Sequence, residues 1–168
     1  MHKCIISLLG LSVASVFAST PAPNRDWPQW RGPDRTGYAK DGPAITSLPK
    51  ELKPVWKIDV GGGFAAPVVQ GNALIYVDEN GSREFAHRID AATGKEVWKI
   101  DRKSDAVGVS REAYASPCLW NDGQRTSLVV LGCDYATGHR LEDGGEIWRL
   151  GGLNPKAKYD AQMQMIQR

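Results

Sequence analysis

The feature that most constrains this chain is a tryptophan-bearing pattern that recurs three times. A β-branched residue, a tryptophan, a basic residue and an apolar residue stand together around Trp56, Trp98 and Trp148, which are 42 and 50 residues apart. A second pattern runs in phase with the first, since residues 64–69 match residues 114–119. Two markers that recur in the same order at intervals of this size indicate a repeat protein.

Each period contains four short β-rich segments separated by turn residues such as Gly71-Asn72 and Thr93-Gly94. This alternation is the hairpin pattern, and no ten-residue amphipathic helical pattern competes with it within residues 55–150. Four strands in a period of roughly 40–50 residues are typical of a β-propeller blade. The sequence therefore predicts an all-β fold, a partial β-propeller of four-stranded antiparallel blades with about two to three blades present. The expected strands are 66–70, 74–77, 85–90, 97–100, 116–120, 127–133, 138–141 and 146–150.

One turn shows how the repeated tryptophan is expected to be placed. Asp90 can accept hydrogen bonds from backbone N–H groups of the turn that follows it, and Thr93 adds a short polar cap. Gly94 can adopt the positive φ that such a turn needs. The turn is therefore expected to fix the direction of Trp98, whose ring can lie between adjacent sheets while its indole N–H reaches a polar partner.

This segment resembles the tryptophan-docking motif of PQQ-like (quinoprotein-type) β-propellers, Ala-x-Asp-x-x-Thr-Gly-x-x-x-Trp, with Arg88 in place of the first Ala. The next copy keeps Gly144 and Trp148, but it has Arg140 and Asp143 where the motif has Asp and Thr. The resemblance implies structural docking roles for six residues: Asp90, Thr93, Gly94, Trp98, Gly144 and Trp148.

The resemblance covers residues 54–155, and Trp27–Pro33 also resembles the start of BamB-like exported bacterial proteins of this group. Residues 54–168 are too few for a closed propeller, which has four or more blades. We therefore expect a truncated member of the family, and assembly of several copies into one ring is the less favoured alternative. Its exposed sheet edges should meet protein partners or missing blades.

The N-terminal residues predict export. Residues 4–18 form an uncharged run that is too short to span a bilayer, follows Lys3, and ends in Val-Phe-Ala, so residues 1–18 are expected to be a signal peptide. Residues 19–53 form a proline-rich extended arm that its aromatic rings are expected to pin onto the domain. The predicted location is the periplasm or the extracellular space.

The net charge and the lack of a long apolar segment exclude two classes of interaction, namely nucleic-acid binding through bulk charge and insertion into a membrane. The formal net charge is +2, which gives no basis for nucleic-acid binding through bulk positive charge, and no segment predicts a membrane span in the mature chain. Cys118 and Cys133 are expected to be two buried thiols rather than a disulfide. Cys118 should lie opposite Leu128 or Val129.

The polar residues predict no catalytic set, no metal ligands and no cofactor-binding residues. His87 and His139 are about one period apart. We expect both histidines to occupy polar positions that face the rim of the propeller. The run 78–80 is expected to be a solvated turn, and Gly61–Gly63 a flexible entry into the first strand.

Two function classes follow from the resemblance. The first is a non-catalytic scaffold that presents loops to partner proteins, and it is favoured because no redox or metal-binding residues stand out. The alternative is a fragment of a PQQ-dependent dehydrogenase, which would need PQQ on the propeller axis and Ca²⁺ bound by carboxylate and amide oxygens.

Overall fold

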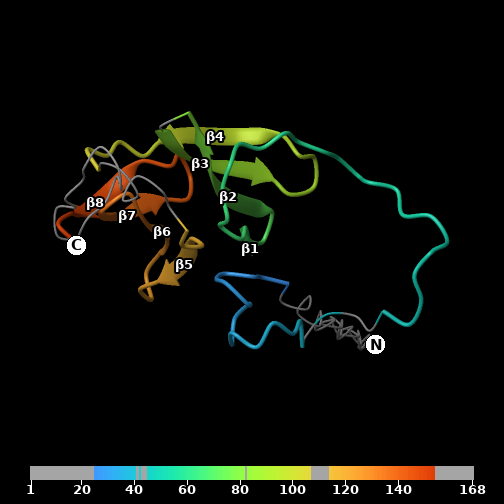
Figure 1. The fold of residues 1–168 in the computed structure, drawn as a ribbon. Coiled ribbons are helices and arrows are strands. Elements are labelled where there is room, and N and C mark those ends of the chain that lie inside the picture. The colour runs from blue at the N-terminus through green and yellow to red at the C-terminus, as the bar shows by residue number, and fades with distance from the viewer. Residues whose placement is uncertain (1–24, 41, 43–44, 82, 107–113, 154–168) are drawn as a thin grey trace, which may run out of the picture.

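A computed structural model places two four-stranded antiparallel sheets next to each other (Figure 1). It describes residues 25–40, 42, 45–81, 83–106 and 114–153. The expected signal peptide at residues 1–18 lies outside the described residues, and so do residues 154–168. Within the described ranges, no helix has the length and apolar character needed to cross a membrane.

Each sheet is built from consecutive strands, so its strand order follows the chain. The first sheet contains β1 (Val68–Gln70), β2 (Ala73–Asn80), β3 (Arg83–Asp90) and β4 (Glu96–Asp101). The second sheet contains β5 (Cys118–Asn121), β6 (Thr126–Gly132), β7 (Tyr135–Arg140) and β8 (Glu146–Leu150). The prediction of an all-β chain with four-stranded antiparallel units is confirmed, with strand ends that differ by a few residues from those expected.

Both sheets carry the same irregularity between their third and fourth strands. The register shifts directly after Arg88 in the first sheet and directly after Gly138 in the second. Before each shift, Arg88 pairs with Trp98 and Gly138 pairs with Trp148. Because a β-bulge bends its strand and re-aims side chains, the matching bulges direct the two tryptophans in the same way.

The turn between β6 and β7 differs from the sequence prediction. Cys133 was expected to end a strand, but Cys133 and Asp134 form the two-residue loop, with φ of 53° and 66°. Positive φ at both loop residues is the geometry that suits a two-residue hairpin. The buried Cys133 thiol donates to Oε2 of Glu84 over 3.1 Å, and this tertiary contact holds a residue type that rarely adopts such a backbone.

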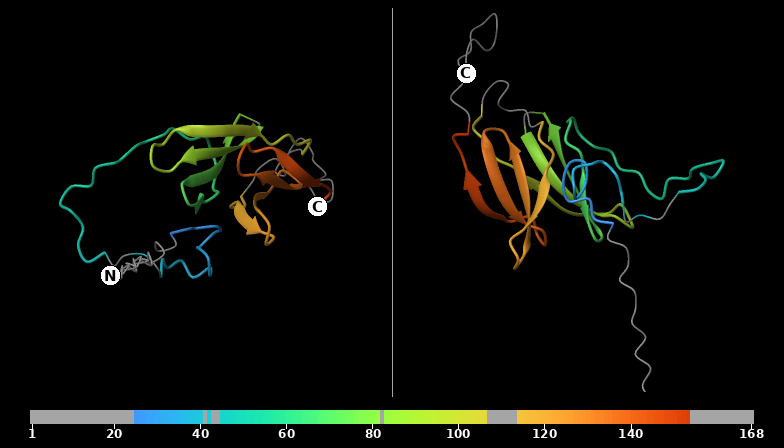
Figure 2. Two further views of the ribbon diagram at one scale, coloured as in Figure 1. Left: turned by 180° about the vertical axis from the view of Figure 1, so that it is seen from behind. Right: turned by 90° about the horizontal axis from the view of Figure 1, so that it is seen from below.

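The hydrophobic core lies between the two sheets, which stand side by side in Figure 2. One face of the first sheet packs against the opposing face of the second, and both faces present alternate residues of their strands. The buried residues of this core are Val68, Ile75, Val77, Ala86 and Trp98 from the first sheet, and Leu128 and Val130 from the second.

The proline-rich arm joins the first strands of both sheets through its backbone. Trp27 exchanges two hydrogen bonds with Val69 of β1, at 2.8 and 2.9 Å. The next residue, Pro28, accepts from the N–H of Leu119 in β5 over 2.7 Å. The arm therefore satisfies edge groups of β1 and β5 that would otherwise need water.

The aromatic rings of the arm do less than the sequence predicted. Trp27 is half-buried and its ring covers Gly32, where a Cβ atom would lie 2.8 Å from the ring. Trp30 and Tyr38 are 60% and 75% exposed, so they do not pin the arm. The expectation of three anchoring rings is wrong because the backbone bonds of residues 27 and 28 supply the attachment.

The glycine run before β1 is also more constrained than expected. Gly62 forms an isolated antiparallel bridge with Glu79 at the end of β2, through bonds of 2.9 and 2.7 Å. A Cβ atom on Gly61 would lie 2.3 Å from the carbonyl oxygen of Glu79. These glycines allow two backbones to approach closely and do not form a loose entry.

Candidate functional site: the tryptophan docking turns

The turn between β3 and β4, which begins at Asp90, is held together by short hydrogen bonds to Asp90. Oδ1 of Asp90 accepts from the backbone N–H and the hydroxyl of Thr93, both at 2.8 Å. The carbonyl of Asp90 accepts from the N–H of Gly94, which has a φ of 72°. The hydrogen bonds from Thr93 lower the pKa of Asp90, so the carboxylate stays ionised and keeps the turn in place.

Trp56 docks onto this turn. Its indole Nε1 donates to the carbonyl of Ala91 over 2.9 Å. A Cβ atom on Gly94 would lie 2.7 Å from Cγ of Trp56, so the ring occupies the space that any larger residue would need. The docking turn at residues 90–94 thus receives the tryptophan that precedes the first sheet, and not Trp98. The sequence marked Trp56 as a repeat of Trp98 but did not identify which turn it meets.

Trp98 makes the same pair of contacts one sheet further along. Its Nε1 donates to the carbonyl of Leu141 over 2.9 Å, and its ring lies over Gly144. A Cβ atom on Gly144 would lie 3.0 Å from Cε3 of Trp98 and 2.8 Å from Cγ2 of Ile100. Trp98 is 9% exposed, and it links the first sheet to the turn between β7 and β8.

The second docking turn reaches the same shape with different side chains. Arg140 and Asp143 form a two-pronged ion pair, with Nε to Oδ1 at 2.9 Å and Nη2 to Oδ2 at 3.0 Å. The carbonyl of Arg140 accepts from the N–H of Gly144 over 3.0 Å, as the carbonyl of Asp90 accepts from Gly94. The ion pair therefore replaces the carboxylate–hydroxyl contact of the first turn, and it lowers the pKa of Asp143.

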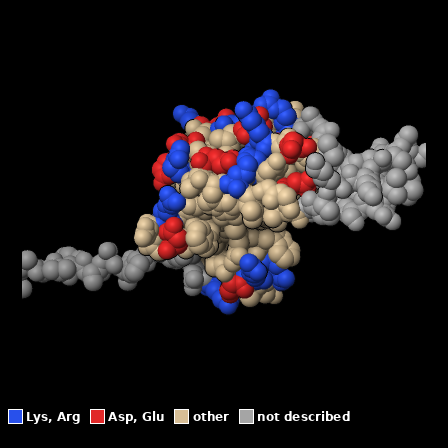
Figure 3. Space-filling model, turned by 90° about the vertical axis from the view of Figure 1, so that its left-hand side faces the viewer, with Lys and Arg blue, Asp and Glu red and all other residues tan. Residues whose placement is uncertain are grey.

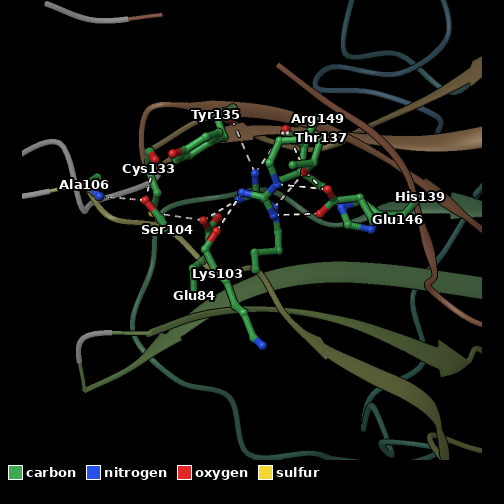
Figure 4. A network of polar contacts seen from close by, with 12 residues as sticks. Glu84, Lys103, Ser104, Ala106, Cys133, Tyr135, Thr137, His139, Glu146 and Arg149 are labelled. Atoms are coloured by element: carbon green, nitrogen blue, oxygen red, sulfur yellow. Dashed lines mark hydrogen bonds and ion pairs between the residues drawn. The ribbon is translucent and has the colours of Figure 1, made fainter. Parts of the chain in front are cut away.

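A buried polar cluster connects the two sheets beside the core (Figure 4). Arg102, which directly follows β4, forms a buried ion pair with Glu84. Its Nε also donates to Oγ1 of Thr137 over 3.0 Å, and its Nη2 donates to the carbonyl of Val130 over 3.3 Å. Burial raises the pKa of Glu84, and burial together with Glu84 raises the pKa of Cys133 to about 12. Burial of the Arg102–Glu84 ion pair costs desolvation free energy, and the hydrogen bonds of Arg102 to Thr137 and Val130 connect the two sheets.

The cluster continues from Thr137 to the second docking turn. His139 Nδ1 lies 3.0 Å from the carbonyl of Gly144, and its Nε2 lies 2.9 Å from Oγ1 of Thr137. Because a carbonyl only accepts, Nδ1 carries the proton and Nε2 accepts from the Thr137 hydroxyl. Burial lowers the pKa of His139, which favours this neutral form. The expected rim position of His139 is wrong, since its ring is buried and supports the docking glycine.

His87 is also buried, which contradicts the expected rim position. Its Nδ1 lies 2.8 Å from Oε2 of Glu96 and its Nε2 lies 3.0 Å from Oδ1 of Asp78. Tyr76 stacks on the ring with a centroid distance of 4.5 Å. Asp78 lies within β2, where its Oδ2 accepts from the N–H of Gly61 over 2.8 Å, so it is not part of a solvated turn.

The two histidines are not structural counterparts. The matching bulges place Thr137, rather than His139, at the position of His87 in the second sheet. Within the part of the chain that the structure describes, no three or more His, Cys, Asp or Glu residues are grouped so that they could hold a metal ion. Cys118 lies opposite Val129, as expected, and the structure has no disulfide between the two described cysteines. Cys133 is buried as expected, whereas Cys118 is only half-buried.

The face that bears Trp148 is the exposed counterpart of the buried Trp98 face. Trp148 is 38% exposed and its ring lies over Gly138, where a Cβ atom would be 2.2 Å from Nε1. In the adjacent row on the same face, Leu131 and Leu150 are 50% and 56% exposed. Figure 3 views the molecule from the side of the second sheet, and a band of uncharged residues crosses it between groups of charged side chains.

Comparison with known proteins adds no family assignment. No family model matches the chain, and no curated protein matches it.

Proposed function

We propose that this chain is a non-catalytic, exported PQQ-like β-propeller repeat protein that acts as a scaffold or protein-binding module. The observation that carries the proposal is the contrast between two equivalent faces. The Trp98 face is buried by a neighbouring sheet, while the Trp148 face has the same apolar character and is exposed among the described residues. An exposed face of this kind, rimmed by charged residues, is typical of a protein interaction site.

The two sheets are proposed to be successive blades. Trp56 and Trp98 each donate an indole N–H to the backbone carbonyl of the second residue of a docking turn, and each covers a glycine with positive φ. Contacts that repeat from one four-stranded unit to the next are the basis of radial repeat architectures. The proposal assigns Trp148 to the next such contact.

The expected partner of this face is a polypeptide. Tryptophan and leucine side chains on one face of a sheet supply a large apolar area, and tryptophan is enriched among residues that dominate protein interfaces. The indole of Trp98 uses a backbone carbonyl as its acceptor, so Trp148 needs only a backbone carbonyl from its partner.

A photocrosslinking experiment tests this function. Benzoylphenylalanine in place of Leu131 should form adducts with another polypeptide chain in cells that export the protein, and Trp148→Ala in the same chain should reduce the adduct yield. The control position is Tyr38, which is exposed on the arm and belongs to neither sheet. Equal adduct yields from positions 38 and 131, or no effect of Trp148→Ala, would contradict the proposal.

Two further measurements complete the test. Export predicts that the mature chain in the periplasm or medium lacks residues 1–18, which intact-mass measurement detects. Dye-linked alcohol oxidation after addition of PQQ and Ca²⁺ would instead support the alternative, a fragment of a PQQ-dependent dehydrogenase.

A further inference from the structure

The contact between the two sheets contains two complementary halves. One half is the Trp98 face of the first sheet, with Trp98, Ile75 and Val77. The other half is the opposing face of the second sheet, with Leu128 and Val130, together with the docking turn of Gly144. Beside the Arg102 cluster, burial of these residues and the indole hydrogen bond of Trp98 hold one four-stranded sheet against the other.

The first half of this contact occurs a second time, on the exposed Trp148 face. Cys118, Val129, Gly138 and Trp148 form one row across the second sheet, as Val68, Ile75, Arg88 and Trp98 do across the first. Glycine stands at the position of Arg88, so a partner that covers this row buries no charged side chain from it.

The second half of the contact, the face with Leu128 and Val130, also has a counterpart. It is the outer face of the first sheet, which is the face opposite to the core residues Ile75 and Val77. Leu74 and Tyr76 hold the positions of Leu128 and Val130, and both line an apolar pocket of about 290 Å³. The Asp90 turn supplies the docking glycine, Gly94. The pocket lies between this face and the segment 56–63, so the face is only partly filled.

We propose that a second copy of this chain is the partner: it docks its Trp148 face onto the outer face of the first sheet, with Trp148 in the position that Trp56 occupies at the Gly94 turn. This inference rests on the proposed protein-binding function and names its partner. In this view Trp56 occupies, within the same chain, a docking slot formed by the carbonyl of Ala91 and by Gly94. It uses the same two contacts, a backbone carbonyl and a glycine, that a partner's tryptophan would use.

The segment that carries Trp56 is less buried than the strand that carries Trp98, so it is the part of the docking contact that a partner sheet would displace. Residues 54–61 form no strand, and Val55 and Val60 are exposed. Trp56 itself is only half-buried, whereas Trp98 is buried in the equivalent contact. A partner sheet would add the apolar burial that the single segment lacks.

The proposed contact is head-to-tail. Each copy would use its second sheet toward one neighbour and its first sheet toward another. Such heterologous contacts produce rings or open arrays rather than isolated dimers. Species larger than a dimer are therefore expected at high concentration.

The experiment measures association of the full 168-residue chain by sedimentation velocity across a concentration series. Trp56→Ala should empty the slot and strengthen association at least about tenfold, because the competing segment loses its anchor. Trp148→Ala should weaken association at least about tenfold, and the double variant should behave like Trp148→Ala. Trp30→Ala, an exposed tryptophan on the arm, is the matched control and should equal the wild type.

Further variants separate docking from misfolding. Gly94→Ala puts a Cβ atom into the space that the docked tryptophan ring needs. In the double variant with Trp56→Ala, it should therefore abolish the stronger association that Trp56→Ala alone produces. Association of the Trp56→Ala chain that persists when Trp148 is also removed would overturn the proposal, since the contact would then lie elsewhere. So would association that is identical in the wild type, Trp56→Ala and Trp148→Ala. Leu131→Asp changes the same face without altering a tryptophan, and it should act like Trp148→Ala.

This test is distinct from that of the proposed function. Crosslinks from position 131 to other polypeptides, with no association between copies, would overturn this inference and leave the protein-binding function standing. Absence of every crosslink from position 131 would remove the function itself.

Discussion

Arg102, which directly follows the last strand of the first sheet, donates from Nε to Oγ1 of Thr137 in the second sheet over 3.0 Å, and both side chains are buried. From Thr137 the hydrogen bonds run through His139 to the carbonyl of Gly144, the residue on which Trp98 packs. The polar cluster and the tryptophan docking turn therefore belong to one connection between the sheets. Four predictions separate the contributions of its parts.

Removal of the indole of Trp98 should destabilise the fold strongly. Trp98→Ala removes a buried ring and a hydrogen bond, so we expect a loss of about 3–5 kcal/mol in the free energy of unfolding. Trp120 is exposed on β5, and Trp120→Ala should change stability by no more than about 0.5 kcal/mol. Urea unfolding followed by circular dichroism measures both, and equal effects would contradict the assignment of Trp98 as the inter-sheet contact.

A methyl group on Gly144 should cost more than the same change at a turn with open space. Gly144 has a φ of 74° and Gly81 a φ of 67°, so alanine is strained by about 1–2 kcal/mol at either position. Only at Gly144 does the new Cβ meet the ring of Trp98, which adds about 1–3 kcal/mol. Thermal unfolding of Gly144→Ala and Gly81→Ala would refute the docking geometry if the two melting temperatures fell equally.

Loss of Arg102 should leave a buried carboxylate without its ion pair. Arg102→Met is expected to cost about 3–5 kcal/mol, and addition of Glu84→Gln should recover part of that loss. The control is Arg83→Met, which breaks the exposed ion pair with Asp101 and should cost at most about 1 kcal/mol. A double variant no more stable than Arg102→Met would show that the charge of Glu84 is not the cause.

The buried His139 should make the fold sensitive to mild acid. Its pKa is lowered by burial from an ordinary value of 6.5, so below that pH the unfolded chain binds a proton that the native chain does not. Its contribution to stability is complete above pH 6.5 and is lost as the pH falls toward the lowered native pKa. The unfolding free energy of the wild type should therefore fall more than that of His139→Asn between about pH 7.5 and 5.5. Parallel pH profiles would contradict a neutral, buried imidazole.

Much of the fold was predictable because its signals are local. The alternation of apolar residues and the loops Gly71-Asn72 and Thr93-Gly94 define hairpins within a few residues of chain. The loop at Cys133 was missed because its backbone depends on Glu84, a residue far away in sequence. No local pattern distinguishes it from the end of a strand.

The docking contacts were only partly predictable for the same reason. Spacing identified Trp56, Trp98 and Gly144 as repeated positions, but the turn that each tryptophan meets is a tertiary property. The histidines were misassigned because a separation of 52 residues resembles the 50-residue period, while the bulges show that it is two residues too long. Arg102 was missed, since a basic residue after a strand usually marks a solvated connection.

The attachment of the arm has a consequence for how this molecule folds. The bond from Leu119 to Pro28 joins positions separated by more than half of the 168-residue chain, whereas every hairpin closes within a few residues. Contacts of large sequence separation form slowly, because the intervening loop must close first. The arm is synthesised before the other described residues. We nevertheless expect it to form its native hydrogen bonds last, after both sheets have folded.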